Sequence, residues 1–160
     1  PESQGGWANL ASVYSLLDRH EQAVDAYRRS AELGDTPPPL LLGWADAHIK
    51  LTQYGRAVNI LNRALQIRPT ARIWERLGYA RFKQRELDAA RDAFRKALEL
   101  NPNHVGALNG LGVVMMSRYL LEASSDPAKH REAVDAWEKS LRLRPDQPAI
   151  RSLLNRYREP

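Results

Sequence analysis

The chain of 160 residues contains no cysteine, which excludes disulfide bonds and thiolate metal sites. It also lacks an apolar run of about 18 residues, and this argues against a membrane-spanning helix. The sequence shows no secretory leader, and it opens at Pro1 rather than at an initiator methionine. We therefore expect a piece of a longer protein, whose compartment stays open with the cytoplasm as the working expectation.

Motifs that would carry catalysis or hold a cofactor are missing as well. The four histidines are scattered, and no two of them form the i, i+4 pair of a helical zinc site. They are His20, His48, His104 and His130. No phosphate-binding loop or nucleophile elbow is present, because Gly106 and Gly110 fall inside a predicted helix. We accordingly expect no enzymatic activity, no cofactor and no metal site.

Positive charge is in moderate excess but is not concentrated anywhere. The formal net charge is +5, from 24 lysines and arginines against 19 aspartates and glutamates. The two signs are interleaved along the predicted helices, which is typical of a solvated helical surface. This balance permits an acidic partner. We expect no nucleic-acid partner, since Asp46 and Glu75 fall among the residues of the expected binding surface.

One stretch, residues 71–104, has the periodicity of a complete helix pair. Its first part places Trp74, Leu77 and Gly78 on one stripe of an amphipathic helix. A polar turn interrupts this stripe, and a second stripe follows. The second stripe consists of Leu87, Ala90, Phe94, Ala97 and Leu98. Pro102 ends it, because proline cannot continue a helix and disfavours the helical conformation of its predecessor.

Copies of this pattern occupy the rest of the chain. The small residue of the second stripe appears at steps of 34, 33 and 43 residues, as Ala23, Ala57, Ala90 and Ala133. The bulky residue of the same stripe recurs as Tyr27, Leu61, Phe94 and Trp137. A single helix pair cannot bury its apolar face alone, so these copies predict a stack of helix pairs.

This period, with Trp74, Leu77 and Gly78 followed by Ala90, Phe94 and Pro102, resembles the tetratricopeptide repeat (TPR) family. Arg81 departs from the family pattern, which prefers tyrosine there. The resemblance implies an all-α, right-handed TPR solenoid of four helix-turn-helix repeats with a C-terminal capping helix. We place the repeats at 4–37, 38–70, 71–104 and 105–147, and the capping helix at 148–158.

The fourth repeat is about nine residues longer than the others, and the extra residues fall near 119–127. The run Ser125-Asp126-Pro127 is typical of a helix start, with a capping side chain followed by proline. We expect the first helix of this repeat to run to about residue 123 and the second to begin at about 127. A tolerated insertion at a loop tip and a functional role both stay open.

In TPR proteins the first helix of each repeat lines the concave wall, so the resemblance also indicates where a partner would bind. Tyr79 and Phe82 fall off the packing stripe of the third repeat, and we expect them to point into this groove. Arg72 and Arg76 precede them on the same face and favour a partner with acidic character. The expected neighbours from the adjacent repeats are Leu42, Asp46, Ile49, Asn109, Val113 and Met116.

Two details of this groove have alternatives. Phe82 could instead pack against the second helix of its own repeat, in place of the aromatic residue missing at Arg81. Some TPR domains bind a terminal carboxylate with a clamp of basic and amide residues, and only Arg72 and Arg76 match it here. The remaining clamp positions fall on Ala8, Ser12 and Gly43, so we do not expect a clamp.

The expected function is non-catalytic protein–protein interaction as a scaffold or adaptor, with a partner's peptide or helix bound in the concave groove. Two alternatives stay open. The chain could self-associate through its uncapped first repeat or through the extended hairpin of the fourth repeat. It could also be the substrate-recruiting arm of a larger enzyme.

Overall fold

The structure, a computed structural model, describes residues 2–121 and 126–158. Every regular element within these residues is an α-helix, and none is long and apolar enough to cross a membrane. The helices are α1 (Gln4–Leu16), α2 (His20–Glu32), α3 (Pro38–Lys50), α4 (Tyr54–Ile67), α5 (Ala71–Lys83), α6 (Leu87–Leu100), α7 (Val105–Leu121), α8 (Pro127–Leu143) and α9 (Pro148–Tyr157). The predicted all-α solenoid is confirmed.

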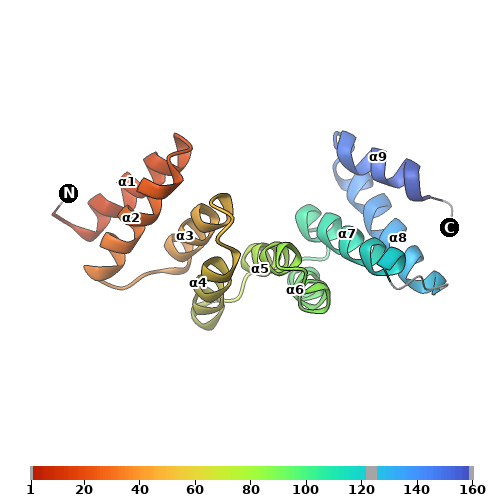
Figure 1. The fold of residues 1–160 in the computed structure, drawn as a ribbon, viewed down its shortest axis with the longest axis horizontal. Coiled ribbons are helices and arrows are strands. Elements are labelled where there is room, and N and C mark those ends of the chain that lie inside the picture. Colours follow the sequence, from red (N-terminus) through yellow and green to blue (C-terminus); the bar gives the residue numbers. More distant parts are fainter. Residues whose placement is uncertain (1, 122–125, 159–160) are drawn as a thin grey trace.

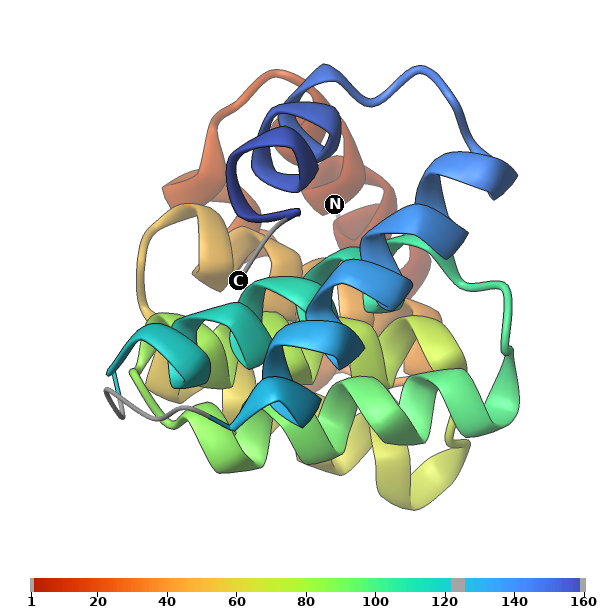
Figure 2. The same ribbon diagram turned by 90° about the vertical axis from the view of Figure 1, so that its right-hand side faces the viewer.

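The helices form an arch with the two termini at opposite ends (Figure 1). Each helix packs against the next one in the chain, from α1 with α2 through to α8 with α9. In Figure 1, α3, α5 and α7 lie on the inner side of the arch, and α4 and α6 lie on the outer side. Figure 2 shows α9, in dark blue, lying above α8 at the end of the arch. The inner side is therefore built from the first helix of the second, third and fourth pairs.

Helices α1, α5 and α8 begin at a side-chain cap. The side chain of Thr70 accepts a hydrogen bond of 3.3 Å from the backbone N–H of Ile73, at the start of α5. Asp126 accepts one of 3.0 Å from the N–H of Ala128, and Pro127 occupies the first position of α8. These side chains satisfy backbone donors that the first turn of a helix leaves unpaired.

The fourth helix pair is longer than the other three. Its helices α7 and α8 have 17 residues each, whereas α1 to α6 have 13 or 14. In the sequence, this difference of about one turn per helix corresponds to the extra residues near 119–127. The expected end of the first helix near residue 123 lies outside the described residues.

The bulky residues of the second helices are buried, and glycines make room for three of them, of which Phe94 and Tyr27 are examples. Phe94 is 2% exposed, and a Cβ atom on Gly110 would lie 2.2 Å from its Cζ atom. A Cβ atom on Gly43 would likewise lie 2.4 Å from the hydroxyl oxygen of Tyr27. Neither distance is sterically allowed, so the aromatic ring and the helix backbone are in direct contact at both places.

The last helix covers the end of the stack. Leu154 of α9 is 8% exposed and packs in the same cluster as Trp137 and Met115. The Nε2 atom of His130 lies 2.7 Å from the backbone oxygen of Tyr157, which holds the end of α9 against the start of α8. The apolar flank of the fourth pair is thereby removed from water.

The turns inside the first three helix pairs each hold one residue in the left-handed region. Asp18, Thr52 and Arg85 have φ angles of 55°, 58° and 65°. Glycine adopts this conformation most easily, yet none of the three positions carries it. Thr52 is the most strained of them, because β-branched residues tolerate a positive φ least.

Replacing Thr52 with glycine should therefore stabilise the protein by about 1 kcal/mol. The gain is the relief of steric strain, reduced by the greater freedom of glycine in the unfolded chain. Thermal unfolding followed by circular dichroism should show a Tm higher by roughly 3 °C. Thr36→Gly is the matched control, since Thr36 has no positive φ and should lose stability. A lower Tm for Thr52→Gly would contradict the assignment of strain.

Candidate functional site

Two neighbouring cavities lie on the inner side of the arch, and Tyr79 of α5 belongs to both. The first has a volume of about 270 Å³ and lies between α5 and α7. The second has a volume of about 540 Å³ and lies between α3 and α5, reaching the start of α4. We call the two cavities together the concave groove.

Seven of the ten residues proposed for partner binding line this groove. Tyr79, Phe82, Asn109 and Val113 line the first cavity, and Asp46, Ile49, Arg76 and again Tyr79 line the second. These residues come from three different helix pairs. The structure therefore brings together side chains that are up to 67 positions apart in the sequence.

The other three proposed residues lie elsewhere. Met116 is 3% exposed and packs in the core, so its side chain is not available to a partner. Leu42 is half-buried against the core cluster that contains α3, α4 and α5 residues. Arg72 is exposed but lines neither cavity. We leave Met116 out of the contact set proposed below.

Phe82 has both of the roles considered for it. It lines the first cavity, and it also packs against the core cluster that contains Phe94 of α6. Arg81, which stands where the family pattern prefers tyrosine, forms an ion pair with Glu86 in the turn before α6. A salt bridge therefore connects the end of α5 to the turn before α6, at the position where the family pattern has an aromatic side chain.

An arginine and two carboxylates form the polar centre of the groove. The Nε atom of Arg76 lies 2.9 Å from Oδ1 of Asp46, and its Nη1 atom lies 3.4 Å from Oε1 of Glu75. Burial raises the pKa of both carboxyl groups, although the charge of Arg76 acts in the opposite direction. The acidic partner stays a prediction, and these ion pairs weaken it because Arg76 already faces two carboxylates.

Asn109 lines the first cavity, and hydrogen bonds to residues outside the cavity fix its side chain. Its Nδ2 atom donates a hydrogen bond of 2.7 Å to Oε1 of Gln147, and its Oδ1 atom accepts one from the Ser140 hydroxyl. Ser140 is fully buried. These bonds fix α7 against α8 and against the residue that precedes α9. They use amide groups that would otherwise be available to a partner.

Four residues of the first cavity are not among the ten proposed for partner binding, namely Glu75, Phe94, Gly106 and Gly110, although Glu75 was already expected on the binding surface. Phe94 carries the periodicity of a core residue, and its ring borders the cavity because Gly110 has no side chain to cover it. The signal in the sequence that could have indicated this cavity is the pair Gly106 and Gly110, one helical turn apart. Lys50, Thr52 and Tyr54 were missed in the second cavity for another reason, since they lie at the turn between α3 and α4.

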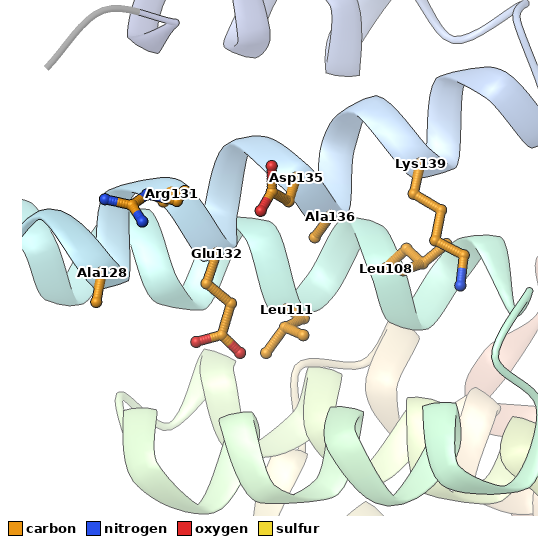
Figure 3. Close-up of a pocket in the computed structure, with 8 residues that line it drawn as sticks. All are labelled: Leu108, Leu111, Ala128, Arg131, Glu132, Asp135, Ala136 and Lys139. Atoms are coloured by element: carbon orange, nitrogen blue, oxygen red, sulfur yellow. The ribbon is translucent and has the colours of Figure 1, made fainter.

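A third cavity, of about 400 Å³, lies between α7 and α8 (Figure 3). Leu108 and Leu111 of α7 form its apolar part, and charged residues of both signs from α8 surround them. These charged residues are Arg131, Glu132, Asp135 and Lys139. Arg95 of α6 binds Glu132 with two of its nitrogen atoms, at 2.7 and 3.2 Å from the same oxygen. The mixed charges indicate no preferred ligand, and we base no proposal on this cavity.

Comparison with known proteins gives consistent matches. Two family models, both described as tetratricopeptide repeat, match residues 42–116 and residues 5–33. A curated relative, Protein CTR9 homolog of Arabidopsis thaliana, is 28% identical over 141 residues, which are 87% of this chain and 12% of that protein. The chain thus spans a small part of the length of this relative.

Two solved structures are similar over most of the chain. YrrB, described as a TPR protein with an unusual peptide-binding site, gives a TM-score of 0.77 at 19% identity and covers 95% of this chain and 74% of its own. The first TPR of Spaghetti (RPAP3), bound to the HSP90 peptide SRMEEVD, gives 0.68 at 23% identity, over 72% and 93%. At these identities the likeness concerns the fold. Since the two family models together match well over half of the sequence, the chain belongs to the tetratricopeptide repeat family.

Proposed function

We propose that the chain is a non-catalytic interaction module, which binds a peptide or a short helix of a partner protein in the concave groove. The observation that carries this proposal is the position of Tyr79. It is the most exposed aromatic residue of the described chain, at 38%, and it stands where the two cavities meet. Rigid aromatic side chains beside a cavity are frequent anchors of protein interfaces.

The related structures support a role of this kind. YrrB is described as having a peptide-binding site, and the RPAP3 domain was solved with a peptide bound. Their similarity to this chain concerns the fold, so they support peptide binding in general and no particular partner. The contact set that we propose consists of Asp46, Ile49, Arg76, Tyr79, Phe82 and Val113.

The double variant Arg76→Glu with Tyr79→Ala should lose at least about thirtyfold in partner affinity, because it removes the aromatic anchor and reverses a charge in the groove. The immobilised chain would be used to capture partners, and each captured protein would then be titrated by calorimetry. Its helicity, measured by circular dichroism, should not change.

Lys96→Glu with Leu100→Ala is the matched control. It makes the same kinds of change at exposed residues of α6, on the outer side of the arch. This control should bind as the wild type does. If the groove variant retains the same partner with unchanged affinity, binding in the concave groove is wrong.

Self-association is the second candidate, and one observation favours it. Val13, Leu16 and Leu17, at the end of α1, are 48%, 84% and 59% exposed. The residues that correspond to Val13 in later repeats are all buried, and they are Ala47, Ala80 and Val114. An apolar helix face that is covered in the other repeats is therefore open in the first. Sedimentation equilibrium at rising concentration separates the two candidates, since a persistent monomer removes this one.

A further inference from the structure

The first cavity of the groove is open because two residues of α7 have no side chain. Gly106 and Gly110 stand one turn apart, and both face α5 across the cavity. A Cβ atom on Gly110 would collide with the ring of Phe94, and one on Gly106 would lie 3.3 Å from the carboxyl group of Glu75. The cavity is therefore bordered directly by an aromatic ring and by a carboxylate. Tyr79, Phe82 and Val113 supply the remaining apolar surface.

The carboxylate of Glu75 lacks a good counter-ion within the described structure. Its side chain is 14% exposed, and among the described residues its one hydrogen bond comes from Nη1 of Arg76 at a long 3.4 Å. The same guanidinium group lies closer to Asp46, at 2.9 Å. Two carboxylates thus share one arginine. A carboxylate removed from water is costly unless a cation and hydrogen bonds compensate it.

We propose that the first cavity receives a lysine or arginine side chain of the partner, with its aliphatic stem against Phe82 and Val113 and its cationic head at Glu75. This rests on the proposed function, whose partner it specifies further. Basic side chains commonly bury their stem while the charged end finds a polar site. The aromatic rings of the cavity stabilise a cation near their faces. A volume of about 270 Å³ accommodates one such side chain.

The other classes of side chain fit the cavity less well. An acidic side chain would bring a third carboxylate beside Glu75 and Asp46. A purely apolar side chain would fill the space but would remove more water from Glu75 without supplying a cation. His104 and, more weakly, Arg72 also act on Glu75, but both act from a distance, since neither lines a cavity of the groove and neither forms an ion pair with Glu75 among the described residues. A basic side chain is thus the occupant that the charges favour.

The test uses small analogues of amino-acid side chains, titrated into the whole chain at pH 7. The probes are n-butylammonium, the neutral alcohol 1-pentanol, which is one carbon longer, and the anion pentanoate. The backbone amide signals of Gly106 and Gly110, followed by two-dimensional ¹H–¹⁵N NMR, report on the cavity itself. We expect n-butylammonium to bind at least tenfold more tightly than 1-pentanol, and pentanoate to bind most weakly.

Glu75→Gln should abolish the preference for the cation while leaving the affinity for 1-pentanol unchanged. Glu99→Gln, which changes an exposed glutamate of α6, is the matched control and should keep the preference. If Glu75→Gln does not fold, Gly106→Ala replaces it. The added Cβ atom narrows the cavity beside Glu75, and binding of n-butylammonium should weaken several-fold.

Three results would overturn the inference: equal affinity for n-butylammonium and 1-pentanol, a preference for pentanoate, or no shift of either glycine signal with any probe. None of them depends on the groove variant Arg76→Glu with Tyr79→Ala. If that variant loses its partner but the probes show no charge preference, the groove binds a peptide and only the basic side chain is wrong. If the variant keeps its partner, the proposed function itself fails.

Discussion

Replacing Gly110 with alanine should destabilise the protein by about 2 to 3 kcal/mol. The added methyl group would lie 2.2 Å from Cζ of Phe94, whose ring is 2% exposed and packed in the core. Either the ring leaves its rotamer or α7 moves away from α6, and both weaken the packing of the third helix pair against the fourth. Elsewhere in a helix, alanine would instead be the better residue by about 1 kcal/mol.

Urea unfolding followed by circular dichroism measures this loss directly. Gly106→Ala is the matched control on the same helix, since its Cβ atom would lie 3.3 Å from the flexible side chain of Glu75. This control should equal or slightly exceed the wild type in stability. Adding Phe94→Leu to Gly110→Ala should recover part of the loss, because the smaller side chain leaves room for the methyl group. Equal stability of the two alanine variants would show that the contact with Phe94 is not tight.

Replacing Arg76 with methionine should cost about 1 to 2 kcal/mol at pH 7. The methionine retains much of the apolar volume of the arginine stem, but Asp46 and Glu75 lose their shared counter-ion. The expected cost is below that of a fully buried ion pair, because the side chains of Arg76 and Asp46 are 35% and 32% exposed and water screens them.

This cost should shrink as the pH falls. Burial holds the pKa of Asp46 and of Glu75 above its ordinary value, and loss of the Arg76 charge would raise both pKa values further. A carboxyl group with a raised pKa binds more protons in the folded than in the unfolded state, so its contribution to stability falls as the pH rises between the two pKa values. Below the unfolded-state pKa values, near about pH 4, both carboxyl groups are largely neutral and need no cation.

The measurement is the difference in unfolding free energy between wild type and Arg76→Met, from urea titrations between about pH 4 and pH 7. Taking the difference cancels the titration of all other groups. Arg72→Met is the control, since Arg72 is exposed and should show a small difference with little pH dependence. A difference that is the same at both ends of the pH range would mean that Arg76 acts through packing and not through charge.

The fold was predictable because its signal is repeated. The alanine and bulky positions recur in every repeat, so the helix periodicity of residues 71–104 could be checked against three further copies. Prolines and caps such as Thr70 and Asp126 then mark the helix starts. The positive φ angles of Thr52 and Arg85 could not be predicted, because neither residue type indicates a left-handed turn.

The candidate site was predictable only in outline. The resemblance indicates which helix faces the groove, and this leads to Tyr79 and Phe82. It does not indicate that Asp46, thirty positions before Arg76, forms an ion pair with it, because such pairing depends on how two helices pack. The hydrogen bonds of Asn109 with Ser140 and Gln147 could not be predicted for the same reason. Side-chain pairing between helices follows from tertiary geometry, which sequence spacing does not contain.

The contact between Phe94 and Gly110 has a consequence for how the four units are ordered. Arg76 occupies the position in the third repeat that Gly110 occupies in the fourth. Gly110 contacts Phe94 of the preceding repeat, and the residue of the second repeat that corresponds to Phe94 is Leu61. The long side chain of Arg76 therefore follows a repeat that carries leucine at this contact. Gly110 follows a repeat that carries the aromatic ring of Phe94. A permuted chain, with the third unit duplicated after itself, would set an arginine against the ring of Phe94. The units are similar but not interchangeable, and their succession along the chain is part of what specifies the shape of the groove.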